Sequence, residues 1–400
     1  MSPDQPERQG QAPRFLYLYA LAVAGGAIAY VPFLTIVLPL HVARFGAQQV
    51  LGVLAYAAFA GAIAASLANI GFGWLSDRSG TRPPWIAAGL VLSCLLLNAM
   101  PLARNPAELT ALIVAWQVSL NMMLAPLSAW GGDCVPDSQK GTLGGLLALA
   151  PALGAMSGAL VTLPGIEGTA LRLAMIAALV LAMVAPVLLA GPPRPMPQLM
   201  APLAAWHGQT DQAADAHPVI RMWLARLLVQ IAEASLFAFL LLWFRSLDPQ
   251  FHEGEMARIF TAVLAVAAIA ALVVGRWSDR ARRPLAPLVA AAAMAGAGLV
   301  IMALAADRAG AIGGYVVFGV ASSVFLSLHS SQTLRVLPAP QHRGRDLGLF
   351  NLTNTVPSLI MPWLTLALVP RYGFDALFLL LATLAGLACV LLASLVRTGR

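Results

Sequence analysis

The sequence predicts an all-α integral membrane protein with twelve transmembrane helices, arranged as two pseudo-symmetric six-helix bundles. The first reason is composition: 60% of the 400 residues are hydrophobic, 10% are charged, and the mean hydropathy is +0.80. Soluble domains are about half apolar and about a quarter charged, so lipid must cover much of this chain. The second reason is an internal repeat. GWLSDRSGTRPP at 73–84 returns as GRWSDRARRP at 275–284, which places Asp77 and Asp279 202 positions apart. A period of half the chain predicts two similar halves.

A second pair of loops supports the same repeat. The loops are CVPDSQKGTLGGL and RVLPAPQHRGRDLGL; Pro136 and Pro338 are 202 positions apart, and Gly141 and Gly344 are 203 apart. Insertion of single residues explains the drift.

The spanning helices follow a polar, proline-containing tail at 1–14. The apolar stretch at 15–40 is longer than the roughly 7–15 apolar residues of a signal peptide, so we expect a first spanning helix rather than a cleaved leader. Eleven more charge-poor segments follow, and most reach the roughly 20 residues that cross the hydrocarbon. They lie at 48–74, 85–103, 109–131, 142–164, 170–190, 221–245, 257–277, 285–306, 311–334, 347–369 and 375–396. Helices are favoured over barrel strands because the period-2 alternation of a barrel is absent.

The bundles are predicted at 15–190 and 221–396, with a short tail at 397–400. Residues 191–220 form the only long connection. They are rich in proline and then polar, which is typical of a semi-rigid linker rather than a domain.

Orientation follows from the basic residues. With the N-terminus inside, sixteen Lys and Arg residues fall in inside segments and seven outside. This bias predicts that both termini and the linker are cytoplasmic and that the protein lies in the cytoplasmic (inner) membrane. The pI near 9.9 would suggest nucleic acid for a soluble protein, but here the basic residues occupy short loops, so no nucleic-acid partner is expected.

The sequence contains no signature of an enzyme. The three cysteines have no metal-binding or disulfide spacing, and Walker, HExxH and GxSxG motifs are missing. We therefore expect no cofactor and no metal. The expected partners of a monomer are a small-molecule substrate, a proton or other cation, and membrane lipid.

Taken together, twelve spans in two repeats, a proline-rich central loop and GWLSDRSGTR after the second span resemble the major facilitator superfamily. The loop signature of that family is matched at Gly73, Asp77, Arg78, Gly80 and Arg82, and in the repeat at Gly275, Asp279, Arg280 and Arg283. DCVPDSQKGTLGGL and RVLPAPQHRGRDLGLFNLTNTVPSLIMP resemble, more locally, the glycoside–cation symporters and sucrose carriers of that superfamily. The resemblance implies a central path lined by spans 1, 4, 7 and 10.

Asp77 falls at the predicted cytoplasmic end of the second span, where a carboxylate can face the positive N-terminus of a helix. The resemblance implies that this helix is the eleventh span, which starts near Leu347, and that Arg82 pairs with Asp133. Such contacts would hold the cytoplasmic side shut and break when it opens. The alternative is that these charges are only topology signals. The predicted cytoplasmic gate comprises Asp77, Arg78, Arg82, Asp133, Asp279, Arg280 and Arg283.

The second half departs from this pattern. The residue 202 positions after Asp133 is Arg335, so Arg283 has no equivalent acid. Arg335 is expected to pair with Asp137 or Asp346, or to face phospholipid.

Glu233 is the only acid well inside a predicted span. Twelve residues beyond Arg221, at about 1.5 Å each, put it roughly 18 Å deep in a hydrocarbon core about 30 Å thick. Arg226 and Gln230 share its helix face. One hypothesis is a protonatable carboxylate that couples proton movement to substrate, with Gln230 as a relay and Arg226 influencing its protonation. The alternative is a structural Glu that hydrogen-bonds a neighbouring helix.

Other polar residues inside spans are candidates for the wall of the path, or for packing contacts between helices. His329 is expected toward the cytoplasmic end of its span, where water would reach it. These candidates are Tyr30, Gln117, Asn121, His329, Gln332 and Asn354.

The sequence therefore predicts a secondary active transporter for a small solute, with a sugar or glycoside favoured and protons as the driving ion. The alternatives are a drug or metabolite exporter of the same superfamily, or a non-transporting assembly or pigment-handling factor on the same scaffold.

Overall fold

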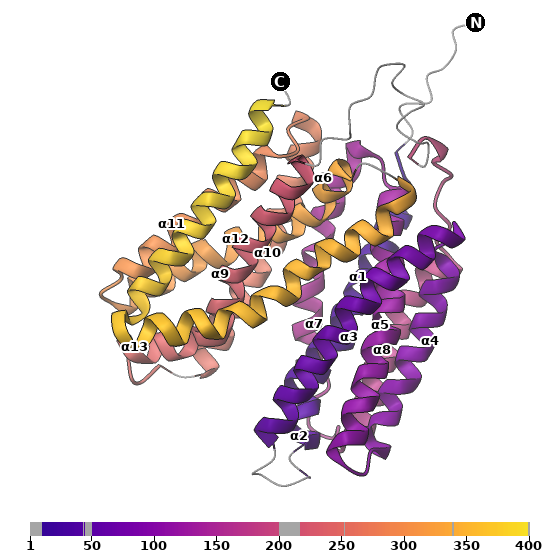
Figure 1. Ribbon diagram of the computed structural model, residues 1–400, viewed down its shortest axis with the longest axis horizontal. Coiled ribbons are helices and arrows are strands. Elements are labelled where there is room, and N and C mark those ends of the chain that lie inside the picture. The colour runs from indigo at the N-terminus through magenta and orange to yellow at the C-terminus, as the bar shows by residue number, and fades with distance from the viewer. Residues whose placement is uncertain are drawn as a thin grey trace, which may run out of the picture. The chain divides into compact units, whose positions relative to one another are not determined.

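The computed structural model describes residues 10–42, 44, 50–199, 217–251, 253–337 and 340–398. In this part of the chain the regular structure is helical, with no strand. Figure 1 shows the elements. They are α1 (Pro13–Pro32), η2 (Phe33–Val37), α2 (Leu38–Val42), α3 (Val50–Ser79), α4 (Pro83–Ala99), η4 (Met100–Leu102), α5 (Pro106–Cys134), η5 (Asp137–Gln139), α6 (Lys140–Leu147), α7 (Leu149–Leu160), α8 (Thr169–Leu189), η6 (Pro197–Leu199), α9 (His217–Leu247), α10 (Glu253–Ala281), α11 (Ala286–Leu304), α12 (Arg308–Val336), η8 (Pro340–His342) and α13 (Arg343–Thr398).

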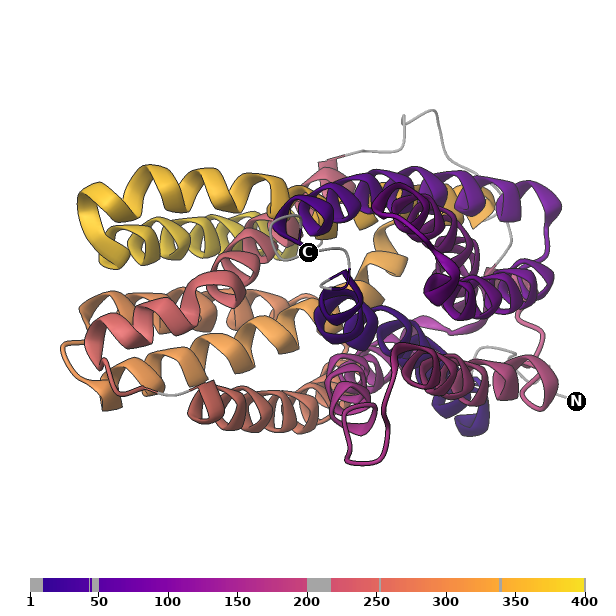
Figure 2. The same cartoon turned by 90° about the horizontal axis from the view of Figure 1, so that it is seen from below.

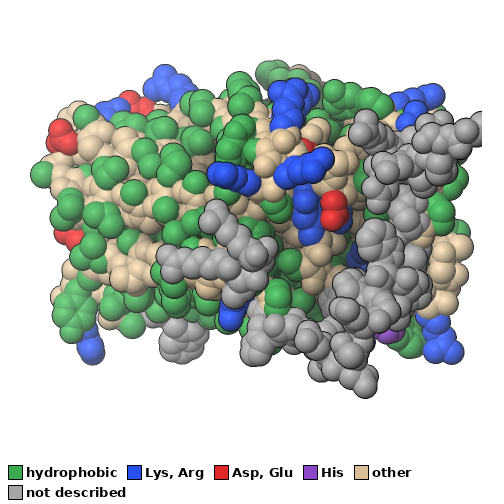
Figure 3. Space-filling model, turned by 90° about the horizontal axis from the view of Figure 1, so that it is seen from above, with side chains coloured by type: hydrophobic (Ala, Val, Ile, Leu, Met, Phe, Trp, Pro, Cys, Tyr) green, Lys and Arg blue, Asp and Glu red, His purple; other side chains and the backbone are tan. Residues whose placement is uncertain are grey.

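Each predicted spanning segment coincides with helix. Ten of the described helical segments have the length and composition of a membrane span, with mean hydropathies from 1.5 to 2.7. The other two predicted spans, 221–245 and 347–369, lie in α9 and the first arm of α13. Large apolar side chains remain exposed on the helices; Leu102, Leu189 and Leu304 expose 75%, 84% and 74% of their surface. On the face drawn in Figure 3, hydrophobic side chains cover much of the described surface. Lipid is the solvent that such a surface requires.

The last two predicted spans are joined within α13. Gly373 breaks this helix with φ 75° and ψ 178°, a left-handed backbone conformation that glycine adopts at little cost. The chain reverses there, between the orange and yellow arms of Figure 1. The break falls between the predicted ends of these spans, 369 and 375.

The first compact unit comprises the described residues of Met1–Lys140, Leu149–Gln209 and Ala339–Gly348. Within it α1 packs on α7 and α8, and α5 packs on α3 and α4. Figure 2 shows the indigo to magenta helices of this unit from below. Edge-to-face aromatic pairs fill its core: Phe15 contacts Trp130 with a 5.4 Å centroid distance, and Phe33 contacts Trp116 at 4.8 Å. Such pairs contribute roughly 0.5–1.5 kcal/mol beyond their buried area.

The second compact unit comprises the described residues of Gly141–Ala148, Thr210–Pro338 and Leu349–Arg400. Its core contains Trp243, edge-on to Phe378 with a centroid distance of 4.7 Å, and Phe244, stacked on Phe251 at 4.4 Å. Short segments of each sequence half thus join the unit that is built mainly from the other half. The division into two contiguous bundles, 15–190 and 221–396, remains a prediction from the sequence. Residues 200–216 of the predicted linker lie outside the described residues.

The sequence repeat also appears in the helix caps. Asn105 accepts a 2.9 Å hydrogen bond from Glu108 N at the start of α5, and Asp307 accepts one of 2.9 Å from Gly310 N at the start of α12. The two caps are 202 positions apart. Each satisfies an amide that the helix leaves unpaired, which stabilises the helix by about 1 kcal/mol.

Candidate functional site

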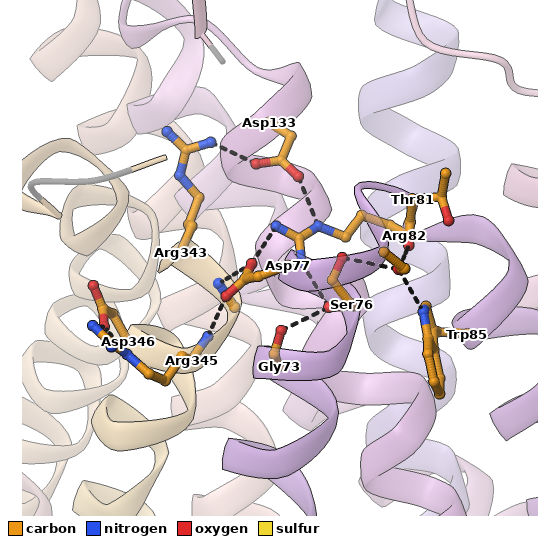
Figure 4. Close-up of polar contacts among 12 residues, drawn as sticks. Gly73, Ser76, Asp77, Thr81, Arg82, Trp85, Asp133, Arg343, Arg345 and Asp346 are labelled. Carbon is orange, nitrogen blue, oxygen red and sulfur yellow. Dashed lines mark hydrogen bonds and ion pairs between the residues drawn. The ribbon is translucent and has the colours of Figure 1, made fainter. Parts of the chain in front are cut away.

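Asp77 lies in the last turn of α3 and caps the start of α13. Its Oδ1 accepts a 2.9 Å hydrogen bond from Gly344 N, and its Oδ2 accepts one of 2.9 Å from Arg345 N. A carboxylate at this place meets two unpaired amides and the positive end of the helix dipole. The chain leaves α3 through Gly80, with φ 67°, and Pro83 starts α4. Figure 4 shows the cap.

Arg82 joins Asp77 to the end of α5. Its Nη2 lies 2.7 Å from Asp77 Oδ1, its Nε lies 2.8 Å from Asp133 Oδ2, and its Nη1 donates to Ser76 Oγ at 2.6 Å. Arg343 completes the group, with Nη1 2.5 Å from Asp133 Oδ1. We call Asp77, Arg82, Asp133 and Arg343 the first gate cluster. Its side chains are 3–9% exposed.

Two buried carboxylates and two guanidiniums leave the first gate cluster without net charge. Burial by itself lowers the pKa of Arg82, but Asp133 and Asp77 outweigh it, so that the pKa is raised. Removal of one partner of such a buried pair typically costs about 3–5 kcal/mol, because the remaining charge is left uncompensated. The cluster therefore stabilises the arrangement in which α13 starts against α3 and α5.

Two glycines allow this approach. A Cβ on Gly73 would lie far inside van der Waals contact of Gly344 O, and a Cβ on Gly344 would collide with Gly73 O. Both obstacles are backbone atoms, which no rotamer change can remove. The glycine at 73 of the loop signature is thus explained by a close backbone contact.

Replacing Gly73 with alanine is expected to destabilise the capped arrangement by about 1–3 kcal/mol, the usual cost of overpacking. Gly71→Ala is the matched control, because it lies on the same helix and a Cβ there meets nothing within 4 Å. The measurement is the thermal unfolding midpoint of each variant in detergent. A Gly73→Ala midpoint equal to or above that of Gly71→Ala would contradict the close contact.

A second gate cluster repeats the first. Asp279, in the last turn of α10, accepts hydrogen bonds from Gly141 N (2.8 Å), Thr142 N (2.7 Å) and Thr142 Oγ1 (2.9 Å) at the start of α6. Gly141 and Gly275 form the same mutually close backbone pair. Arg335 Nη2 lies 3.4 Å from Asp279 Oδ1. We call Asp279, Thr142 and Arg335 the second gate cluster.

From the sequence we expected Arg335 to face Asp137, Asp346 or phospholipid and did not name Asp279, with which Arg335 pairs in the structure. Arg335, on α12, carries the charge opposite to that of Asp133 in the first half. Its guanidinium pairs with Asp279, the carboxylate that caps α6, and this ion pair replaces the arginine–acid pair that Arg283 lacks. Asp137 pairs with Lys140 (2.6 Å) and Asp346 with Arg345 (2.8 Å).

The remaining predicted gate residues are exposed. Arg78 lies over the ring of Trp74, with 5.7 Å between the guanidinium carbon and the ring centroid. Arg280 and Arg283 have exposed side chains. These three stay available for lipid headgroups or water, which is what a topology signal requires.

Polar side chains gather on three helices of the second unit. Arg226, Gln230 and Glu233 are half-buried on one face of α9. On α12, three half-buried serines follow one another with spacings of four and three residues: Ser323, Ser327 and Ser330. On α13, Asn351 is half-buried and Asn354 is exposed. We call these eight residues the polar stripe.

Arg226 ties the stripe together. Its Nε donates to Thr353 Oγ1 at 3.0 Å, its Nη1 to Ser330 Oγ at 2.9 Å, and its Nη2 to Asn354 Oδ1 at 3.4 Å. Asn354 Nδ2 in turn donates to Asn351 Oδ1 at 2.7 Å. The structure therefore brings Arg226 and Asn354 together.

Glu233 lies two turns further along α9. Among the described residues, the Glu233 carboxylate makes no hydrogen bond and no ion pair. The side-chain oxygen of Gln230, Oε1, is buried and has no hydrogen-bond partner among these residues. Glu233 interacts electrostatically with Arg226. The stripe thus carries one guanidinium and one carboxyl group that do not bond each other.

His329 and Gln332 do not belong to the stripe. His329 is 0% exposed; its Nε2 lies 3.0 Å from Met222 O and its Nδ1 3.1 Å from Thr333 Oγ1. The expectation of a wet histidine was wrong, because its side of α12 packs on α9. Gln332 is 1% exposed, and neither amide atom finds a hydrogen-bond partner among the described residues.

In the first unit, Asn121 joins two helices. Its Oδ1 accepts from Asn69 Nδ2 at 2.8 Å and its Nδ2 donates to Gln117 O at 2.9 Å, and the side chain is buried. Gln117 is half-buried next to Gly61, and Tyr30 is 42% exposed. Asn121 therefore has the contacts of a packing residue, while Gln117 and Tyr30 remain accessible.

Sequence reasoning missed Arg343, Thr142, Ser330 and Thr353. A signal for Arg343 was present, since Lys140 and Arg343 are 203 apart, like Gly141 and Gly344. Ser330 and Thr353 belong to no sequence motif that would have singled them out. Among the described residues no group of His, Cys, Asp or Glu side chains is arranged to hold a metal ion.

The model of the Major Facilitator Superfamily matches residues 15–339 and 222–400. No curated protein matches the chain. Among solved structures, the E. coli fucose:proton symporter FucP superposes with a TM-score of 0.73 at 14% identity, covering 95% of this chain and 98% of that one. The human organic anion transporter MFSD10 (TETRAN) gives 0.70 at 16%, covering 97% and 100%. A bacterial homologue of the iron transporter ferroportin in its outward-facing state gives 0.70 at 16%, covering 95% and 98%.

Proposed function

The chain belongs to the Major Facilitator Superfamily, and on that premise we propose that it moves a small solute across the cytoplasmic membrane by proton-coupled alternating access. Transporters of this fold bind substrate near the membrane midplane and rock one bundle against the other. The proposal needs a polar site at mid-depth, a group that carries the proton, and contacts that hold one side shut.

The polar stripe is the observation that carries the proposal. Its side chains are partly accessible, yet they lie on helices that the sequence predicts to cross the membrane. Polar side chains on spanning helices face protein or a water-filled path rather than hydrocarbon. We therefore assign the stripe to the wall of the substrate path.

Glu233 is the proposed proton carrier. It is partly accessible and makes no hydrogen bond with the described residues, so its carboxyl group is not tied to a neighbouring helix. A structural Glu would be expected to satisfy its oxygens on a neighbouring helix. On the same helix face, Gln230 would relay the proton, and Arg226 would respond to the charge of Glu233.

The two gate clusters are the proposed cytoplasmic gate. In each, the start of one helix is held by a capping aspartate and a close glycine pair. Opening of the cytoplasmic side would separate these segments. The cost of breaking the contacts, a few kcal/mol, is in the range that a bound ligand can offset.

Support for the solute class comes from the loops. The resemblance of DCVPDSQKGTLGGL and of its repeat to glycoside–cation symporters favours a sugar or glycoside-like solute, and one structural neighbour is named as a fucose:proton symporter. The basic residues of the loops support cytoplasmic termini.

The test is uptake by proteoliposomes. The compound that most stabilises the purified protein in a thermal-shift screen of sugars, glycosides and sugar acids serves as the radiolabelled solute. We expect accumulation above the external concentration when a pH gradient is imposed, and none in protein-free liposomes. Equilibration without accumulation would contradict proton coupling, and absence of any uptake would contradict transport.

A further inference from the structure

Arg226 is held by neutral groups only. Within the described residues its hydrogen-bond acceptors are Thr353 Oγ1, Ser330 Oγ, Asn354 Oδ1 and Leu326 O. None of these carries a charge, and no carboxylate lies within 4.0 Å of the guanidinium among the described residues. Charges on membrane-spanning helices are expensive and are normally paired. A guanidinium without a counter-ion therefore needs an explanation.

The guanidinium also has unused donor capacity. Arginine has five N–H donors, and the Nε and Nη1 groups make the two short bonds, to Thr353 and Ser330. Nη2 has one described acceptor, Asn354 Oδ1, at 3.4 Å. Asn354 is exposed. The end of the guanidinium with spare donors is thus on the accessible side of the polar stripe.

Glu233 does not pair with Arg226 in this arrangement. It lies seven residues further along α9, about 10 Å along the helix axis, so its carboxyl group acts on the guanidinium only at longer range, without an ion pair among the described residues. The hydroxyl groups next to Arg226 are also committed, since Ser330 donates to Leu326 O and Thr353 to Phe350 O. They orient the guanidinium without neutralising it.

We propose that Arg226 binds an anionic group of the solute, with Ser330 and Asn354 beside it, and that the solute class is a small organic acid. A carboxylate fits because the planar guanidinium offers parallel donors that match its two oxygens. This proposal rests on the transport function above and deepens it by naming the charge of the substrate. A sugar acid would satisfy both the loop resemblance and the guanidinium.

The first test uses the unmodified full chain in detergent. Glucuronate, lactate and benzoate are each compared with their own amides, glucuronamide, lactamide and benzamide, in thermal-shift titrations at constant ionic strength. Each pair differs in charge and little in shape. We expect at least one acid to bind at least about tenfold more tightly than its amide, because hydrogen bonds from a guanidinium to a carboxylate are stronger than those to a neutral amide. Equal binding of acid and amide, or no binding by any acid, would overturn the proposal.

The second test places that preference at Arg226. Arg226→Gln is expected to bind the preferred acid and its amide equally, whereas Arg226→Lys should keep a reduced preference because the charge remains without the fork. Arg276→Gln is the matched control, since this arginine of the same unit is exposed on α10. An acid preference that survives in Arg226→Gln overturns the assignment. The acid–amide comparison on the unmodified chain decides the substrate charge even if Arg226→Gln fails to fold.

These outcomes are separable from those of the transport assay. Binding is measured without a membrane, so a selective acid that binds but is not accumulated by proteoliposomes would refute proton-coupled transport and leave the anion site standing. Accumulation of a neutral solute, without any preference for an acid over its amide, would support proton-coupled transport and refute the anion site.

Discussion

Glu233→Gln is expected to abolish accumulation driven by a pH gradient while preserving exchange of solute between the two sides of a liposome membrane. The amide keeps the shape and the hydrogen-bonding capacity of the carboxylic acid but cannot release a proton. A carrier locked in the protonated form can still change its orientation with solute bound. We expect the ratio of internal to external solute to fall to about one, with counterflow rates within a few-fold of those of the unmodified protein.

Glu167→Gln is the matched control, because Glu167 is exposed in the loop before α8. If Glu233→Gln still concentrates the solute under a pH gradient, the carboxyl group is structural and the proton travels elsewhere. If this variant is not recovered in a folded state, Glu233→Asp tests the same point, since it retains titration and should retain accumulation at a reduced rate.

Asp77→Asn is expected to open the first gate cluster. The substitution removes the charge that two amides and Arg82 share at 2.7–2.9 Å. Loss of a buried, paired carboxylate costs about 3 kcal/mol, which shifts an equilibrium between closed and open forms by roughly 100-fold. Asp279→Asn should have a smaller effect, because its partner Arg335 is more distant, at 3.4 Å, and more exposed.

A native cysteine reports this opening. Cys134 follows Asp133 directly and is buried, with 7% of its surface exposed. After Cys94→Ser and Cys389→Ser remove the other thiols, the rate of maleimide labelling measures the accessibility of Cys134. We expect Asp77→Asn to label at least about tenfold faster. Asp375→Asn changes an exposed carboxylate and serves as the control. Unchanged labelling in a folded Asp77→Asn variant would leave Asp77 with a topology role only.

The fold was predictable because its causes are local. Twelve apolar stretches of sufficient length each require a helix in lipid, and the repeat of Asp77 at Asp279 divides the chain in two. The family signature then indicated the capping contact of Asp77 and the pairing of Arg82 with Asp133, and the structure places both.

The partners that joined distant segments were harder to predict. Arg343 pairs with Asp133 across 210 positions. The spacing of residues in a single sequence does not reveal such a contact; the only signal was that Arg343 is the repeat equivalent of the basic residue Lys140. The reversed charge at Arg335 was visible in the repeat, but its partner Asp279 was not, because the contact joins α12 to the end of α10 across 56 positions. His329 shows a further limit: depth along a helix is readable from the sequence, but the neighbour that a side chain faces depends on packing.

Substrate-driven proton movement tests most directly whether Glu233 couples protons to solute. Purified protein is placed in liposomes that contain a pH-sensitive dye, with no initial pH or voltage gradient, and the solute is added outside. We predict that the lumen acidifies in step with solute entry for the unmodified protein, and that Glu233→Gln exchanges solute without any change in dye signal. Solute entry without acidification in the unmodified protein, or equal acidification in Glu233→Gln, would contradict the proposed mechanism.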